Sequence, residues 1–232
     1  MNIAIILSSG VGKRMGAGKN KTLLTLDKKP LIYYAIENFE KSKLINKIIL
    51  VVRAGEEEIF KNIADKYGFK KIVKIIAGGK ERQDSAYNGL KFIEEKFGKF
   101  KNMILLFHNG ANPFVAQEEL KRVINDAKRF GAAVVAHKTK DTIRKVDKRG
   151  LSQGVIDRNN LWNMQTPQAI KFPLALRAFN QAKRDNFLGT DDVSLVERLG
   201  RAVKIVEASE NNFKVTTPLD LELAKVVLKK IY

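Results

Sequence analysis

Glycine and basic residues gather in one segment near the start of the chain, Ser8–Lys21. Glycine lets the backbone turn sharply and approach a ligand closely, and exposed amides beside basic side chains suit a chain of phosphates. Two common phosphate motifs do not fit. The dinucleotide fingerprint needs glycine where Met15 stands, and the P-loop needs glycine at Lys13 and Ser or Thr at Asn20. The segment therefore predicts a phosphate-binding loop of another type, with a flexible basic turn as the alternative.

Three further segments that follow apolar runs carry unusual polar residues: Gly78–Ser85, His108–Val115 and the residues after Ala136. In open parallel sheets, ligands bind outside the carboxyl ends of the strands, so these loops are expected to meet at one edge. His108 and His137 each end a predicted strand. We expect both to be neutral and hydrogen-bonded to the backbone rather than catalytic.

The elements that must position these loops alternate regularly. Short apolar runs, nearly continuous as in strands covered on both faces, are separated by amphipathic stretches with helical spacing, which indicates crossovers and a parallel sheet. The expected strands are 3–7, 47–52, 71–76, 103–107 and 132–136, and the expected helices are 31–39, 56–67, 85–97, 117–130, 173–183, 191–199 and 218–230. The predicted fold class is α/β: a Rossmann-like, mostly parallel sheet sandwiched by helices, with a protruding β-arm.

Residues 138–162 interrupt this alternation. Two strand-like pieces, 142–146 and 154–157, flank a turn at Asp147–Gly150, which predicts a β-hairpin. The hairpin is too small to bury a core of its own, so we expect it to lie on another surface, either of its own chain or of a second subunit. The organisation expected is a single domain over residues 1–232, with 138–162 forming a β-hairpin dimerisation arm.

Composition excludes several classes of protein. The chain has 232 residues, no cysteine and two histidines, so disulfides, thiolate chemistry and multi-histidine metal sites are not expected. The opening apolar run is too short for a signal peptide and no run could span a membrane, so we expect a soluble, cytoplasmic protein. The formal net charge of +18 raises nucleic-acid binding as an alternative. The basic residues are scattered through every expected helix and aromatic residues make up only 8%, which disfavours it.

An ordered set of motifs resembles the 2-C-methyl-D-erythritol 4-phosphate cytidylyltransferase family, within the sugar-nucleotide pyrophosphorylase-type nucleotidyltransferases. The motifs span nearly the whole chain: Ser8–Met15 with Lys21, Gly78–Ser85, Asp141–Arg144, Asp157–Trp162 with Gln165–Gln168, Thr190–Asp192, and Asn212–Leu221. The family transfers CMP from CTP to a polyol phosphate and releases pyrophosphate. The resemblance thus implies a CTP-dependent enzyme of isoprenoid precursor synthesis with Mg²⁺ on the nucleotide phosphates.

The resemblance also implies roles for residues. The expected catalytic residues are Arg14 and Lys21, which would hold the phosphates and stabilise charge on the α-phosphoryl group. The expected nucleotide-binding residues are Ser8, Ser9, Gly10, Gly12, Gly79, Arg82, Ser85 and Asn109. The expected acceptor-binding residues are Asn112, Thr142, Arg158, Thr166, Thr190 and Lys214, with Thr142 and Arg158 supplied by the partner subunit's arm in a homodimer. For Arg82 a structural ion pair, and for Thr190–Asp192 a helix cap with an acidic first turn, are equal alternatives.

The chain departs from the family at two positions in the loop after Phe107. Asn109 stands where the family has an aspartate near ribose, acceptor and metal, and Asn112 stands where it has an arginine. One negative and one positive charge are lost together, so the local net charge is unchanged. No protein ligand for the metal is therefore certain. If the two residues normally pair, their joint replacement by amides could keep the geometry.

These departures leave alternatives to the main expectation of CMP transfer to methylerythritol phosphate. One is an enzyme for ribitol 5-phosphate or another polyol phosphate on the same scaffold, and another is a member with weakened activity because of Asn109 and Asn112. A third is an inactive homologue that binds CTP. Retention of cations such as Arg14, Lys21 and Lys214 argues against decay of the site.

Overall fold

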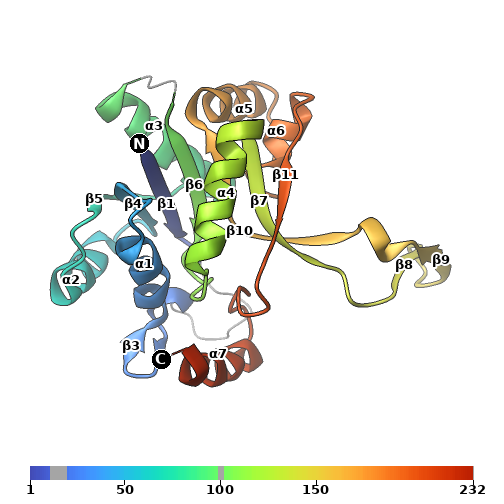
Figure 1. Cartoon of the computed structure of the whole chain (residues 1–232), viewed down its shortest axis with the longest axis horizontal. Coiled ribbons are helices and arrows are strands. Elements are labelled where there is room, and N and C mark those ends of the chain that lie inside the picture. The colour runs from blue at the N-terminus through green and yellow to red at the C-terminus, as the bar shows by residue number, and fades with distance from the viewer. Residues whose placement is uncertain (11–19, 99–101, 232) are drawn as a thin grey trace.

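A computed structural model describes residues 1–10, 20–98 and 102–231. Within these ranges, seven strands form one twisted sheet in the order β11-β7-β10-β6-β1-β4-β5 (Figure 1). The strands are β1 (Asn2–Ser8), β4 (Lys47–Val52), β5 (Ile72–Ala77), β6 (Ile104–Asn109), β7 (Ala132–Lys138), β10 (Trp162–Lys171) and β11 (Lys204–Glu207). All neighbours pair in parallel except those of β10, which runs antiparallel to both β6 and β7. The predicted α/β fold with a mostly parallel sheet is confirmed.

Helices cover both faces of the sheet because its central strands are apolar on both sides. Alternate residues of β1 show this: Ile3 and Ile5 pack into the core beneath α3 (Arg82–Phe97), α5 (Phe172–Arg184) and α6 (Ser194–Arg198). Ala4 and Ile6 pack into the opposite core, against α1 (Leu31–Lys41), α2 (Glu57–Tyr67) and α4 (Gln117–Phe130).

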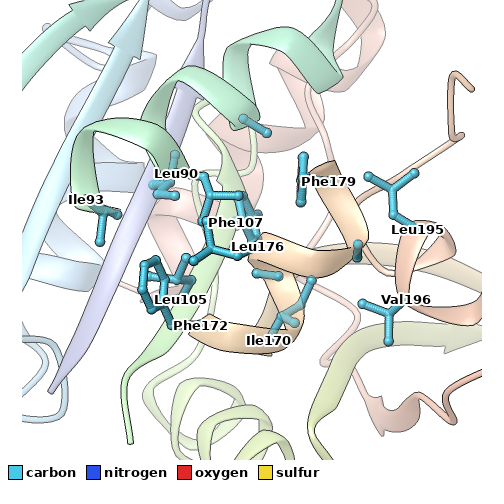
Figure 2. Packing of buried hydrophobic residues seen from close by; sticks show 14 of the residues in the cluster. Leu90, Ile93, Leu105, Phe107, Ile170, Phe172, Leu176, Phe179, Leu195 and Val196 are labelled. Atoms are coloured by element: carbon cyan, nitrogen blue, oxygen red, sulfur yellow. The ribbon is translucent and has the colours of Figure 1, made fainter. Parts of the chain in front are cut away.

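The first of these cores is built around aromatic side chains. Phe107 of β6 and Phe179 of α5 lie with their ring centroids 5.3 Å apart, and Leu90 of α3 packs beside them (Figure 2). Gly89 lets α3 approach the sheet closely, since a Cβ there would lie 2.7 Å from Ile5 Cγ2. Tight packing in this layer holds the carboxyl ends of β1 and β6 in place relative to the helices α3 and α5.

Strand β10 is the main element that the sequence did not predict. Its ten residues include Pro167, which lacks an amide hydrogen and normally excludes a central strand. The pairing of β10 with β7 shifts register between Met164 and Gln168, and Pro167 lies in that irregularity, where no ladder hydrogen bond is required of it. The short edge strand β11 was also not predicted.

The region around residues 138–162 differs in its details from the prediction. Lys138 and Trp162 pair with each other in the main sheet, as the ends of β7 and β10. Beyond them β8 (Ile143–Val146) and β9 (Ser152–Ile156) form a separate two-stranded sheet, followed by the 3₁₀ turn Arg158–Asn160. This hairpin projects far from the body of the molecule (Figure 1).

Helix boundaries match the expected ones closely, with two corrections. The helix expected at 85–97 begins three residues earlier, at Arg82, and the helix expected at 191–199 begins only at Ser194, after Val193 as N-cap. The remaining elements are the 3₁₀ turn Lys21–Leu23, the small hairpin of β2 (Thr25–Leu26) and β3 (Lys29–Pro30), and α7 (Pro218–Ile231). Helix α7 packs on the β2 side through Ala224 and Val227, at the foot of the body (Figure 1). In the described ranges, the helices are all too short or too polar to cross a membrane.

Candidate functional site

A cavity of about 420 Å³ lies at the carboxyl ends of β1 and β6 and beside the loop after β5. This is the edge at which α/β sheets bind ligands. Its lining joins segments far apart in the sequence: Leu7, Ser8, Ser9, Gly10, Lys21, Thr22, Gly79, Lys80, Glu81, Arg82, Asn109, Ala111, Lys214 and Thr216. The lining contains four cationic side chains and one carboxylate, so the cavity suits a polyanion.

Lys21 is held at the cavity by a dense set of hydrogen bonds around Asn20. The Asn20 amide donates to Ser8 O at 2.6 Å and to Glu56 Oε2 at 2.7 Å, and its Oδ1 accepts from Thr22 N and Thr22 Oγ1. Asn20 thereby caps the 3₁₀ turn that Lys21 begins. Lys21 Nζ donates to Val215 O at 2.8 Å, which ties this turn to the segment that carries Lys214.

The second loop packs directly against the first. Ser85 Oγ lies 2.8 Å from Ser9 Oγ and accepts from Gly79 N at 3.1 Å. Gly78 permits this contact, because a Cβ at that position would come within 2.6 Å of Ser9 Cβ. Ser85 is fully buried and stands behind the cavity wall, whereas Gly79 lines the cavity. The Ser85 hydroxyl therefore fixes the two loops relative to each other.

Arg82 makes a bidentate ion pair with Asp192, with N···O distances of 2.9 and 2.6 Å. Burial opposes the charged guanidinium, but the buried Asp192 carboxylate outweighs it and raises the pKa of Arg82. The Nε of Arg82 donates to Asn109 Oδ1 at 3.0 Å. Arg82 thus forms the ion pair given as an alternative from the sequence, and it also lines the cavity.

The two asparagines at the departing positions contact each other. Asn109 Nδ2 donates to Asn112 Oδ1 at 3.4 Å, and Asn112 Nδ2 donates in turn to Gln165 Oε1 and Asn212 Oδ1, both at 3.3 Å. Asn109 lines the cavity, while Asn112 is fully buried behind it. An amide pair therefore occupies the place of the family's aspartate and arginine.

Both histidines bond to the backbone, as expected from the sequence. His108 Nε2 lies 3.0 Å from Asn112 O, and His137 Nε2 lies 2.9 Å from Asn212 O. Complete burial lowers the pKa of His108 to about 3, and its Nδ1 has no hydrogen-bond partner. His108 therefore stays neutral near pH 7 and is fully buried, so it does not serve as an acid or base in the cavity.

Gly12 and Arg14, two of the candidate residues, fall outside the described residues. Thr142, Arg158, Thr166 and Thr190 are described and do not line this cavity. Thr166 is buried and its Oγ1 accepts from Asn109 N at 3.3 Å. Thr142, Arg158 and Thr190 are exposed and do not line the cavity; Arg158 donates to Lys140 O at the start of the arm.

The two aspartates of the Thr190–Asp192 motif bond to different partners. Asp191 Oδ1 accepts from Ser194 N at 2.9 Å, which caps the start of α6, while Asp192 pairs with Arg82. Gln168 joins both, because its Nε2 donates to Asp191 Oδ2 and its Oε1 accepts from the backbone of Asp192 and Val193. The motif is therefore a cap and a support for Arg82.

The side chains in and around the cavity offer few ligands for a metal ion. In the part of the chain that the structure describes, no group of three or more His, Cys, Asp or Glu side chains could hold one. Asn109 Oδ1, at the family's aspartate position, already accepts from Arg82. These residues do not fit a metal held by protein ligands alone. They fit a nucleotide that arrives with its own cation, since Mg²⁺ usually keeps several waters and substrate phosphates as ligands.

Several cavity residues were not predicted from the sequence. Lys80 and Thr216 line the cavity, and Gln165 and Asn212 stand behind it. All four residues lie inside motifs already recognised, so their position was an available signal. The motif did not show that Asn212 bonds to Asn112, because that contact joins residues about a hundred positions apart.

Comparisons with known proteins agree with this geometry. A family profile described as 2-C-methyl-D-erythritol 4-phosphate cytidylyltransferase (IspD) matches residues 2–230. The chain is 44% identical over 225 residues to the 2-C-methyl-D-erythritol 4-phosphate cytidylyltransferase of Geobacillus thermodenitrificans, covering 97% of this chain and 96% of the relative. It is 44% identical over 227 residues to the protein of the same name from Shouchella clausii, covering 98% and 96%.

Solved structures give the same result. The 4-diphosphocytidyl-2C-methyl-D-erythritol synthase of Anaerococcus prevotii superposes with a TM-score of 0.84 at 27% identity, covering 99% of this chain and 96% of that one. The 2-C-methyl-D-erythritol 4-phosphate cytidylyltransferase of Francisella tularensis superposes with a TM-score of 0.81 at 27% identity, covering 97% and 98%.

Proposed function

The chain belongs to the 2-C-methyl-D-erythritol 4-phosphate cytidylyltransferase family, and on this premise we propose that it transfers CMP from CTP to 2-C-methyl-D-erythritol 4-phosphate and releases pyrophosphate. The observation that carries this proposal is the cavity. It combines a cationic lining with the loops Ser8–Gly10 and Gly79–Arg82 at the carboxyl edge of the sheet. The reaction would supply a precursor for isoprenoid synthesis.

The reaction places little demand on acid–base groups. A phosphate oxygen of the acceptor attacks the α-phosphorus of CTP, the bond to the bridging oxygen breaks, and pyrophosphate leaves. The attacking oxygen is already ionised near neutral pH, so no general base is needed. Catalysis then depends on positioning and on charge stabilisation. That agrees with a cavity lined by Lys21, Lys80, Arg82 and Lys214 and with a neutral, buried His108.

Within this cavity we assign Lys21, with Arg14, to the phosphates of CTP. Ser9, Gly10 and Gly79 line the cavity, and no atom of the described residues lies within 4 Å of a Cβ built on Gly10. Such a loop can approach a triphosphate and base closely. Lys214, held beside Lys21 through Val215, faces the same space and suits the phosphomonoester of the acceptor.

Magnesium enters this proposal as part of the substrate. Mg²⁺ bound to CTP would neutralise part of the triphosphate charge, and the cationic lining would stabilise the rest. Asn109 contributes at most a neutral oxygen there, in place of a carboxylate. The protein's contribution to metal affinity is correspondingly small.

We further propose that the chain acts as a homodimer through its arm. The arm exposes large apolar side chains that a monomer would leave in water: Val146 at 54%, Leu151 at 53%, Val155 at 60% and Ile156 at 39%. Thr142 and Arg158 lie on this same projecting segment, away from their own chain's cavity, so they can contribute to acceptor binding only in another copy. The cytoplasmic location expected from the sequence stays a prediction.

An acceptor panel tests the proposed function. Purified protein is incubated with CTP, MgCl₂ and either methylerythritol phosphate, ribitol 5-phosphate or another polyol phosphate, and pyrophosphate release is followed. We expect release with methylerythritol phosphate and little with the others. Release only with another polyol phosphate would replace the acceptor, and thermal stabilisation by CTP without release would indicate a binding protein. ATP, GTP and UTP in place of CTP provide the matched control for the base.

A further inference from the structure

A continuous chain of hydrogen bonds runs from the cavity to α4. Arg82 Nε donates to Asn109 Oδ1 at 3.0 Å, Asn109 Nδ2 to Asn112 Oδ1 at 3.4 Å, and Asn112 Nδ2 to Asn212 Oδ1 at 3.3 Å. Asn212 Nδ2 then donates to Glu119 Oε2 at 3.0 Å. Three amides therefore connect a guanidinium to a carboxylate, and every link points in the same direction.

The two ends determine that direction. Arg82 can only donate, so Asn109 must turn its carbonyl oxygen toward it. An ionised Glu119 can only accept, so Asn212 must turn its NH₂ group toward that carboxylate. Asn112 lies between Asn109 and Asn212. If the Asn112 amide flipped, its NH₂ group would face the NH₂ group of Asn109, and its oxygen would face the oxygen of Asn212. An amide has two nearly isosteric orientations, and here only one of them satisfies all the partners.

The Glu119 carboxylate is itself fixed in position, so it can fix the orientation of Asn212. It lies in the first turn of α4, is 4% exposed, and does not line the cavity. Its Oε1 accepts from Ser209 N and its Oε2 accepts from Ala116 N and from Asn212. A carboxylate that receives three donors from separate segments cannot rotate without leaving a buried donor unsatisfied.

We infer that Glu119 is a positioning residue: with Arg82 at the other end of the chain, it holds the Asn109 amide in one orientation in the cavity through Asn112 and Asn212, whose Nδ2 also donates to Thr166 O at 3.0 Å. This inference rests on the proposed function for its kinetic test. A family-type aspartate at position 109 has two equivalent oxygens and needs no such control, because either oxygen can accept from Arg82. The asparagine at this position therefore creates a dependence on Glu119 that a carboxylate would not have.

A double-mutant cycle tests this dependence. Glu119→Ala is made in the natural chain and in Asn109→Asp, and kcat and KM for both substrates are compared. In the natural chain, which has Asn109, we expect Glu119→Ala to lower kcat/KM about tenfold or more. In the Asn109→Asp background we expect the same substitution to lower kcat/KM less than about threefold. A purely structural loss would lower kcat/KM equally in both backgrounds. Glu119→Gln keeps an oxygen for Asn212 and Ala116 and should restore most of the activity. Glu118→Gln changes the exposed neighbour on α4 and is the matched control.

A second measurement is independent of turnover. In protein labelled with ¹⁵N-asparagine, the Asn109 side-chain NH₂ signals, assigned by their loss in Asn109→Asp, should shift or split in Glu119→Ala and not in Glu118→Gln. If Glu119→Ala does not fold, Asn212→Ala breaks the chain and leaves the Glu119 contacts with α4 and Ser209 in place. Equal kinetic losses in both backgrounds, or unchanged Asn109 signals in the folded variant, would overturn the inference. Absence of CTP turnover in the natural chain would instead remove the proposed function and leave the NMR test valid.

Discussion

The cavity and the arm are opposite kinds of functional region. In the cavity, residues such as Arg82 and Asn20 are fixed by several hydrogen bonds to distant parts of their own chain. On the arm, β8 and β9 bond chiefly to each other, and the strand residues from Arg144 to Val146 and Ser152 to Ile156 are exposed. Arg158 donates to a backbone oxygen at the base of the arm, that of Lys140. The described part of the cavity is thus held in place by its own chain, whereas in the proposed homodimer the arm would acquire a fixed environment only from the partner.

The largest effect should come from removing Lys21, the described cation that we assign to the phosphates of CTP. Lys21→Met should lower kcat/KM by about 10²–10³-fold, because preorganised charge aimed at a phosphoryl transition state is typically worth this much. Steady-state pyrophosphate release with the CTP–Mg²⁺ complex measures it. Lys61→Met, on the exposed face of α2, should leave the rate unchanged. A drop of less than about threefold for Lys21→Met would remove this residue from the phosphate site.

The arm's contribution can be separated from the cavity's by mixing subunits. Arg158→Ala should lower affinity for the acceptor and leave CTP binding nearly unchanged, since it removes one clamp on a phosphomonoester. Mixing the inactive Lys21→Met variant with Arg158→Ala, after reversible denaturation, should restore activity above either homodimer. A hybrid can pair an intact Lys21 cavity with an intact arm from the other chain. If activity in the mixture equals the average of the two variants, the arm does not act between subunits.

The same comparison predicts that the arm loses its role when its exposed apolar side chains are replaced by charged ones. Val155→Asp combined with Ile156→Asp should shift the protein to monomer in light scattering and lower turnover, since a dimer interface does not tolerate buried unpaired carboxylates. Lys148→Asp, at the exposed turn between β8 and β9, controls for the added charge. Retention of a dimer by the double variant would place the subunit contact elsewhere.

Acid should destabilise the body through His108. Burial lowers its pKa from about 6.5 to about 3 in the folded chain. The unfolded chain therefore binds a proton more readily, and this contribution to stability is fully present above pH 6.5 and declines as the pH falls toward 3. In that window, stability should fall by at most about 1.4 kcal/mol per pH unit from this group. Urea unfolding at a series of pH values measures it. His108→Gln keeps a group able to bond to Asn112 O and should reduce the slope; an unchanged slope would contradict the assignment.

The smallest effect concerns Asn109 itself. Asn109→Asp should strengthen magnesium-dependent turnover, lowering the Mg²⁺ concentration for half-maximal rate by a few-fold, because a carboxylate is a better Mg²⁺ ligand than a carboxamide. A magnesium titration of the rate at fixed CTP measures it. No change would mean that the metal depends on the triphosphate alone. Asn163→Asp, on the exposed part of β10, is the control for an added charge.

Much of the fold was predictable because buried parallel strands have nearly continuous apolar sequences. Strand β4 and helix α4 have the predicted bounds, and the other predicted elements shift by a few residues at most ends. Strand β10 was not predictable in this way, since it is polar and contains Pro167. Its place in the centre of the sheet depends on a register shift that only the neighbouring strands reveal.

The sequence by itself determined the fold class, and it predicted a phosphate-binding first loop and, against the family pattern, the departing pair Asn109 and Asn112. Those follow from local residue types and order along the chain. Only the tertiary structure decided that Arg82 pairs with Asp192, that the two asparagines bond to each other, and that Glu119 terminates their chain of amides. The physical reason is that a hydrogen bond joins atoms near in space, and its energy depends on burial and direction, neither of which is encoded in the spacing of residues.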